Sequence, residues 1–204
     1  ETVRAHMKKL KYILIIVIGL GLISCGKNYR IDKKYLEYIP YEKNEVLVFK
    51  SDQNRMDTIF IKDLRRTNGC YDPLAISSDD CEGYSLTCEK SDPNYDRYLP
   101  GEIVRIGVSP DDVTYISFDI TMRNSWFYSM EHYSLNEFDS IPNKKMTIED
   151  KTYGDVKTFE PDEYGEQYSS RDNYVERFYW SKENGFLGLD TKSEKWRLIK
   201  KYVP

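Results

Sequence analysis

The chain has 204 residues, and its 30 basic and 34 acidic side chains give a net charge of −4 at pH 7. A chain of this sign does not suit a polyanionic partner, so the composition argues against nucleic-acid binding. Aromatic residues make up 14% of the sequence, and this content indicates an ordered core although 31% of the residues are charged.

Residues 7–24 have the layout of a bacterial secretory signal. Three lysines come first, and an unbroken apolar run of 12 residues follows from Tyr12 to Ile23. A membrane-spanning helix needs about 20 apolar residues, so the shorter run favours a cleaved signal helix. An uncleaved short anchor and a buried core helix stay open as alternatives. Residues 1–6 precede the first Met and are interpreted as an upstream extension or an over-called start.

The end of this segment, Leu22-Ile23-Ser24-Cys25, resembles the lipobox of bacterial lipoproteins. The resemblance implies cleavage before Cys25, lipid attachment to Cys25 and a mature protein tethered to a membrane. Gly26 follows where an inner-membrane retention signal has Asp, and residues 26–30 lack an acidic run that resembles a surface-export signal. We therefore expect a lipid-anchored protein of the cell envelope, in the outer membrane and facing the periplasm.

Removal of the signal changes the charge and the length of the chain. Without residues 1–24, the remaining 180 residues hold 26 basic and 33 acidic side chains, a net charge of −7. This length suits one domain. Residues 25–34 are polar and charged, so we expect a tether there, followed by a single β domain over residues 35–204.

Three further cysteines, Cys70, Cys81 and Cys88, lie in or beside one turn-rich segment. An exported protein occupies a compartment that permits disulfides, and three cysteines allow one bridge and one thiol. We prefer a Cys70–Cys81 bridge that leaves Cys88 free, which would contribute about 2–4 kcal/mol of stability. The spacing contains no paired C-x-x-C motif and no histidine is near, so no metal site is predicted.

From residue 45 to residue 108 the chain contains short β-rich runs separated by turn signals. The first two runs predict a hairpin. Clustered Gly, Pro, Asp and Ser predict a loop over 68–83, and further turn signals fall within 90–101. The predicted strands of this part are 46–49, 56–64, 84–89 and 103–108.

The clearest predicted strand covers Val113 to Met122. Apolar and polar residues alternate strictly along it, which indicates one dry face and one wet face in an antiparallel sheet. Residues 126–130 are expected to pair with this strand. The dry face is also the candidate ligand face, and it consists of Ile116, Phe118, Ile120 and Met122.

Residues Ser134 to Glu137 match a capping box, the motif that begins many helices. Pro142 would end such a helix within two turns. We favour the alternative, an irregular strand that continues through Phe138.

The C-terminal part predicts a β-meander. Asn184-Gly185 lies between two apolar runs, and this pair is a strong hairpin signal because both residues tolerate positive φ. The chain as a whole is therefore mainly β, with nine or ten strands in an antiparallel meander that forms an open half-barrel, a barrel or a sandwich. The predicted C-terminal strands are 146–148, 153–159, 174–180, 186–189 and 196–199.

Two segments of this part, residues 146–156 and 178–189, resemble a pattern in small, uncharacterised β-rich lipoproteins of the Bacteroidota. Trp196 and the early Tyr38-Ile-Pro-Tyr41 are similar as well. None of these segments is a catalytic motif. The resemblance implies a Gram-negative envelope, and some such proteins are expected to resemble the open half-barrel of periplasmic lipoprotein carriers.

Motifs for catalysis are weak throughout. His132 is the single histidine after the signal, and the chain has neither a G-x-S-x-G nor a C-x-x-C motif. Adjacent carboxylates occur, but in an acidic surface they are ordinarily solvated turn residues. The segment Asp92–Asp96 is better explained as an Asx turn than as a calcium loop. No catalytic residue, metal or cofactor is therefore predicted.

The sequence leaves three functions open. The first is a lipid-anchored, non-enzymatic β domain that binds or scaffolds an envelope partner. The second is a half-barrel that carries a lipid or an acyl chain on the apolar face defined above. The third is an unrecognised envelope enzyme, which would require His132 and carboxylates to cluster in a pocket.

Overall fold

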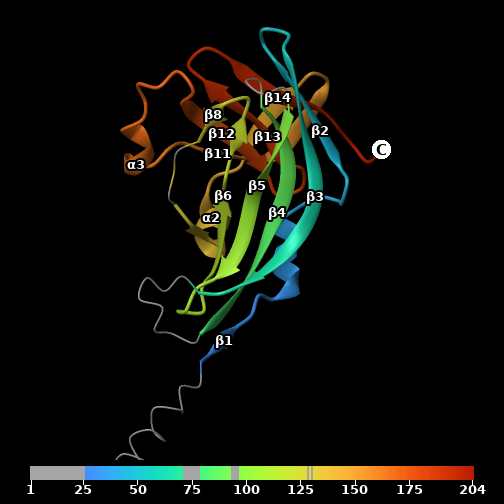
Figure 1. Ribbon diagram of the computed structural model, residues 1–204. Helices are drawn as coiled ribbons and strands as arrows, with labels where there is room; N and C mark the ends of the chain where they lie inside the picture. The colour runs from blue at the N-terminus through green and yellow to red at the C-terminus, as the bar shows by residue number, and fades with distance from the viewer. Residues whose placement is uncertain (1–25, 71–78, 93–96, 128, 130) are drawn as a thin grey trace, which may run out of the picture.

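One curved sheet of 12 strands forms most of the protein (Figure 1). The computed structural model describes residues 26–70, 79–92, 97–127, 129 and 131–204. The strands of the sheet are β1 (Asn28–Tyr29), β2 (Val46–Ser51), β3 (Met56–Asn68), β4 (Asp80–Asp92), β5 (Arg97–Val108), β6 (Thr114–Phe118), β9 (Tyr133–Ser134), β10 (Lys144–Ile148), β11 (Lys151–Phe159), β12 (Val175–Ser181), β13 (Gly185–Thr191) and β14 (Lys195–Tyr202).

The remaining elements are short. They are the hairpin of β7 (Thr121–Met122) and β8 (Ser125–Trp126), the 3-10 helix η1 (Lys33–Tyr38), and the helices α2 (Leu135–Ser140) and α3 (Glu163–Glu166). No helix within the described ranges is both long enough and apolar enough to cross a membrane. The predicted signal, including Cys25, lies outside the described residues.

The sheet confirms the predicted mainly β, antiparallel meander and has the form of an open half-barrel. Its strand order is β10-β11-β12-β13-β14-β2-β3-β4-β5-β6-β9, and only β1 pairs in parallel, with β4. The C-terminal meander thus joins the first half of the sheet through β14 and β2, where Leu198 lies opposite Phe49. Strands from the two ends of the domain therefore meet in the middle of the sheet.

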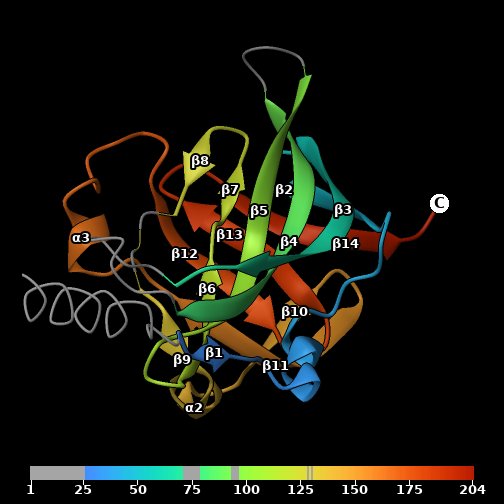
Figure 2. The same ribbon diagram turned by 60° about the horizontal axis from the view of Figure 1, so that its bottom comes forward.

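Helix α2 links the two edges of the sheet. Strand β9 ends at one edge, and β10 begins the opposite edge only ten residues later. Because so short a connection cannot span a flat sheet of this width, the sheet must curl until its edges approach each other. Figure 2 shows α2 next to β9 at this opening. Phe138 of α2 is fully buried and packs on the rings of Tyr38 and Phe118.

The predicted irregular strand through Phe138 is wrong, because the capping box does begin a helix. The Ser134 N–H donates to Glu137 Oε2 at 2.8 Å, and the Glu137 N–H donates to Ser134 Oγ at 3.2 Å. At the other end, Lys157 Nζ donates to the Ile141 carbonyl at 2.7 Å. A helix this short is marginal alone, so these caps and the buried Phe138 are what stabilise it.

An aromatic cluster fills the inside of the half-barrel; it consists of Phe118, Phe138, Phe159, Phe178 and Trp180. The ring centroid of Phe118 lies 5.0 Å from that of Phe159, 5.1 Å from Phe178 and 4.8 Å from Trp180. Phe159 and Phe178 stack at 4.7 Å with an interplanar angle of 9°. These rings occupy the concave side, which an internally bound lipid would need.

The predicted ligand face is therefore core. Ile116, Ile120 and Met122 are each exposed by 2% or less, and Phe118 belongs to the aromatic cluster. The alternation correctly identified a dry face, but this face packs against the protein's own side chains. The predicted single strand is also interrupted: β6 ends at Phe118, and β7 pairs with β8 in a separate hairpin.

Several strands are longer than the sequence predicted. Strand β3 continues to Asn68, and β4 and β5 extend through much of the region expected to be turns, with Glu89 opposite Pro100. Long-range backbone pairing has overridden the local turn signals here. Strands β3, β4 and β5 consequently run along the length of the molecule (Figure 1).

The described part of the predicted tether, residues 26–34, is docked on the sheet. Strand β1 pairs Asn28 with Asp80 and Tyr29 with Cys81. Ile31 is 6% exposed, and its N–H donates to Glu82 Oε2 at 2.8 Å. The first part of β4 extends beyond its pairing with β5, so it offers backbone groups that the polar segment can use.

The C-terminal hairpin forms at the predicted Asn184-Gly185 pair. Gly185 has a φ of +80°, and an added Cβ would lie 2.2 Å from Tyr41 Oη. The Phe186 N–H donates to this same hydroxyl at 2.6 Å. Glycine is thus required by both the backbone and the close approach of Tyr41, which ties the N-terminal segment to β13.

Candidate ligand-binding site

A cleft of about 750 Å³ lies beside the start of β4, where β1 pairs with it. Its walls come from the start of β4, the β5–β6 turn, β6 and the start of α2. We call it the Arg105 cleft, and its lining residues are Gly69, Cys70, Cys81, Arg105, Val108, Ser109, Pro110, Val113, Tyr115, His132, Ser134 and Glu137.

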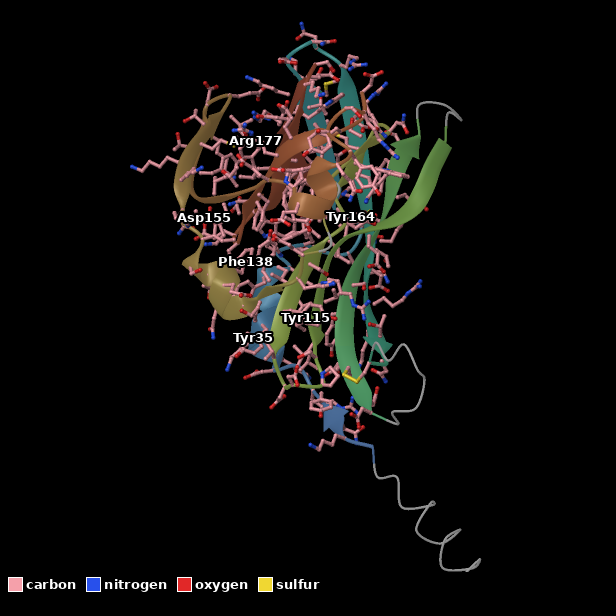
Figure 3. All side chains as sticks on the ribbon, turned by 90° about the vertical axis from the view of Figure 1, so that its left-hand side faces the viewer. Tyr35, Tyr115, Phe138, Asp155, Tyr164 and Arg177 are labelled. Atoms are coloured by element: carbon pink, nitrogen blue, oxygen red, sulfur yellow. A yellow bond between two sulfur atoms is a disulfide. The ribbon has the colours of Figure 1, made fainter. Side chains whose placement is uncertain are left out.

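The cleft occupies the face of the sheet opposite the core. Ile106 and Ile116 lie opposite each other and are fully buried on the core face. Because successive side chains of a strand alternate between faces, Arg105 and Tyr115 project to the other side. Figure 3 shows Tyr115 on β6 near the disulfide, at the end of the molecule where β1 lies.

Two glycines lie beneath Arg105 and Tyr115 and form the floor on which these two side chains rest. Gly83 pairs with Gly107, which in turn pairs with Tyr115. A Cβ on Gly107 would lie 2.4 Å from Tyr115 Oη, and a Cβ on Gly83 would lie 3.3 Å from Arg105 Nε. The missing side chains therefore allow the phenol ring and the guanidinium to lie flat on the sheet.

Three buried polar atoms near this floor have no hydrogen-bond partner within the described residues; they are Arg105 Nε, Thr67 Oγ1 and Ser85 Oγ. Ser85 pairs with Arg105 across β4 and β5. Arg105 also makes no ion pair with any residue of the described ranges. Each buried polar group without a partner costs about 1–3 kcal/mol of stability. Of these three residues, Arg105 lines the cleft and is the one that a ligand there can reach.

One wall of the cleft is aromatic. The rings of Tyr115 and His132 pack edge to face with centroids 5.1 Å apart. Glu137 also lines this wall of the cleft. Its carboxylate accepts hydrogen bonds from the Ser134 side chain and from the Ser134 backbone N–H, and these bonds lower its pKa. Glu137 is therefore ionised and already hydrogen-bonded to Ser134. It makes no ion pair with Arg105 within the described residues, so it does not neutralise the charge of Arg105.

A second, smaller cleft of about 310 Å³ adjoins the first. Arg105, Tyr115 and His132 line both clefts. The second cleft adds carboxylates and hydroxyls, namely Glu102, Asp119, Glu131, Ser117 and Ser129. Arg105 therefore lies between the two clefts.

Within the described residues, the structure brings together no nucleophile–base pair at His132. Ser129 Oγ donates to Asp162 Oδ2 at 3.2 Å, and within the described chain His132 forms no hydrogen bond with either nearby serine. A nucleophile needs a base within hydrogen-bond reach. No group of three metal-ligating side chains occurs among the described residues either.

The cysteines have the arrangement that the sequence analysis preferred. Cys70 and Cys81 form a disulfide with a Cα–Cα distance of 4.7 Å, and the bridge lies in the wall of the Arg105 cleft. Cys88 is a buried free thiol. Burial raises its pKa to about 11, so it is protonated and unreactive at neutral pH.

Sequence reasoning missed Arg105 and the glycine floor. The available signal was the presence of Gly83 and Gly107 inside strand-like runs, since a glycine within a strand often marks a close approach. His132 was considered and does line the cleft. The predicted ligand face, in contrast, contributes only Phe118, at the edge of the smaller cleft.

A third cleft, of about 280 Å³, lies near Trp196. Two of its charged groups are paired, because the Arg55 guanidinium binds the Glu194 carboxylate through two nitrogens. Arg123 also lines this cleft, and its guanidinium donates to the Met56 carbonyl at 3.2 Å.

Comparison with known proteins adds no relative. No family model matches the chain, and no curated protein and no solved structure matches it significantly.

Proposed function

We propose that this chain is a lipid-anchored protein of the cell envelope whose β domain binds a ligand without transforming it. The anchor is the lipid on Cys25, in the outer membrane and facing the periplasm, and the binding site is the Arg105 cleft. The observation that carries the proposal is the Arg105 guanidinium, which lines a cleft of about 750 Å³ and makes no ion pair within the described residues.

The anchor is supported by the sequence pattern of residues 7–25, in which a basic start, an apolar core and a lipobox-like end occur in order. The disulfide agrees with an exported protein, because such bridges persist in oxidising compartments.

The site is expected to bind an anionic group. A guanidinium offers several donors in a rigid fork that matches carboxylate and phosphate oxygens. The Tyr115–His132 pair provides a flat wall beside it. A carrier function through the concave side has less support, since the aromatic cluster fills that side.

Two measurements test the proposal. The full chain, expressed in a Gram-negative host and purified from membranes, should carry a lipid on Cys25 by intact mass, and Cys25→Ala should abolish that mass. Inorganic phosphate serves as the probe of the site. It should raise the unfolding midpoint of the wild-type chain, because a ligand that binds only the folded state stabilises it.

The phosphate effect should disappear in Arg105→Gln. The matched control is Lys145→Gln, which removes one positive charge from an exposed position on the edge strand β10. If phosphate stabilises wild type, Arg105→Gln and Lys145→Gln equally, the anion does not bind at Arg105 and the proposed site is wrong.

A further inference from the structure

The Arg105 cleft lies close to the point where the anchored chain enters the domain. The Lys27 N–H donates to Asp79 Oδ1 at 2.7 Å, and the Lys27 carbonyl accepts from the Asp80 N–H at 2.8 Å. Only Gly26 separates this fixed residue from Cys25. An extended chain spans at most about 3.6 Å per residue, so two residues of chain allow the attached lipid a reach of at most about 7 Å from Lys27.

The same geometry places the cleft near the lipid. Tyr29 pairs with Cys81, which lines the cleft. Tyr29 follows four positions after Cys25 in the chain, a reach of at most about 14 Å, and neighbouring strands lie about 5 Å apart. A lipid on Cys25 would therefore hold the cleft wall within about 20 Å of the membrane surface, with no long tether to release it.

The rim of the cleft suits contact with a bilayer. Val113 in the β5–β6 turn is 46% exposed, and Pro110 beside it is exposed as well. The turn is held by hydrogen bonds in both directions between Ser109 and Val113. An apolar side chain on a rigid turn can enter the headgroup region at little entropic cost.

The charges of the rim restrict the kind of lipid. Asp111 and Asp112 are exposed in the same turn and would repel an anionic surface. Arg105 inside the cleft attracts a phosphate. A zwitterionic phospholipid meets both conditions, because its phosphate can reach Arg105 while its cationic end lies near the two carboxylates.

We propose that the Arg105 cleft faces the membrane and holds the phosphate headgroup of a zwitterionic phospholipid of that membrane. The phosphate lies on the Arg105 guanidinium beside the Tyr115 ring, and the acyl chains leave the cleft past Val108 and Val113. This inference deepens the proposed function and rests on the lipid attachment at Cys25.

The orientation is tested with the full lipidated chain in phosphatidylethanolamine–phosphatidylcholine vesicles. A fluorophore is placed at Val113→Cys or, as a matched control, at Met56→Cys, which is 48% exposed at the opposite end of the molecule. Buried Cys88 is protected from the label. Acyl-chain-brominated lipid should quench the label at 113 and leave the label at 56 unchanged.

Headgroup binding is tested by native mass spectrometry of the same protein released from these vesicles. The wild-type chain should retain one phospholipid, and Arg105→Gln should retain it about tenfold more weakly, since a charge-assisted hydrogen bond contributes roughly that factor. Lys145→Gln should match wild type. Vesicles rich in phosphatidylglycerol should give less retained lipid.

The outcomes separate the two proposals. If Cys25 carries lipid and phosphate stabilises the chain through Arg105, but the label at 113 is not quenched or phospholipid is retained equally by Arg105→Gln, the membrane-facing site is wrong and the proposed function stands. If Cys25 carries no lipid, the proposed function and this inference both fail.

Discussion

The two ends of this sheet use their space in opposite ways. At the C-terminal meander, Phe178, Trp180 and Phe186 are exposed by 1% or less, and their rings fill the inside of the curve. At the β1 end, Gly83 and Gly107 leave room on the opposite face for the Arg105 guanidinium, which makes no ion pair within the described residues. Unpartnered polar atoms occur at both ends, because Trp180 Nε1 also lacks a hydrogen-bond partner within the described part of the chain. The ends differ in that aromatic rings fill one of them and a cleft opens at the other.

The two ends contribute to the stability of the fold in opposite directions. A buried aromatic side chain contributes roughly 1.5–3 kcal/mol, and ring pairs add to this. The unpartnered atoms of the cleft reduce stability by a similar amount each. A folded domain can tolerate such atoms only where other contacts compensate, and the aromatic cluster supplies these contacts. Local stability is therefore expected to differ between the ends.

The largest expected difference comes from the same substitution at two glycines. Gly188 has a φ of +145°, and a Cβ would lie 2.0 Å from the Trp196 carbonyl oxygen. Gly188→Ala should lower the free energy of unfolding by about 3 kcal/mol, because the backbone itself must shift. Gly107→Ala should cost about 1 kcal/mol, since the Tyr115 ring can swing away. Urea unfolding measures both.

Gly154→Ala is the control for this pair, because nothing lies within 4 Å of its Cβ position. It should change stability by less than about 0.5 kcal/mol. A cost at Gly107 as large as that at Gly188 would show that the cleft floor is as rigid as the core, and would break the contrast between the two ends.

Opening the disulfide should weaken the β1 end selectively. The bridge joins residues 11 apart, so Cys70→Ser with Cys81→Ser should lower the free energy of unfolding by about 2–3 kcal/mol. Hydrogen exchange should accelerate in β1 and in the first residues of β4, while β12 and β13 stay protected. Equal acceleration in β12 would mean that the two ends unfold as one unit.

The smallest expected effect is a loss of stability of the β1 end at low pH. Burial acts to raise the pKa of Glu82, but hydrogen bonds from the Ile31 N–H and the Tyr84 hydroxyl, together with Arg66, outweigh it and lower the pKa. A carboxyl whose pKa is lower in the folded state stabilises that state above its unfolded pKa of about 4.3. This contribution is lost as the pH falls through the folded value.

Residues 26–31 should accordingly loosen from the sheet below about pH 4. Amide exchange at Ile31 reports this directly, and Glu82→Gln should remove most of its pH dependence. If exchange at Ile31 is unchanged by acid in the wild-type chain, Glu82 does not hold this segment.

Much of the fold follows from local patterns. The hairpins at residues 184–185 and 149–150 form where turn residues separate alternating runs, because the two-residue period of a strand depends only on the chain itself. The Cys70–Cys81 bridge agrees with its spacing, and the capping box at Ser134 was visible but undervalued. These features need only neighbouring residues to form.

The location of the site could not be predicted in the same way. Alternation identifies the dry face of Ile116 and Phe118, but it does not say whether protein or ligand covers that face. Only the pairing of β14 with β2, and the short crossing by α2, bring the aromatic rings together to fill it. The cleft then falls on the other face.

By itself, then, the sequence determined the strands, most turns and the choice of disulfide, along with the lipobox-like end of the signal. The tertiary structure decided the strand order, the docking of residues 26–34 and the strand register. This register places Gly83 and Gly107 beside Arg105 and Tyr115. The reason is the distance along the chain over which each effect acts. Side-chain periodicity and turn chemistry act over a few residues, whereas register between strands depends on contacts between residues far apart in the chain.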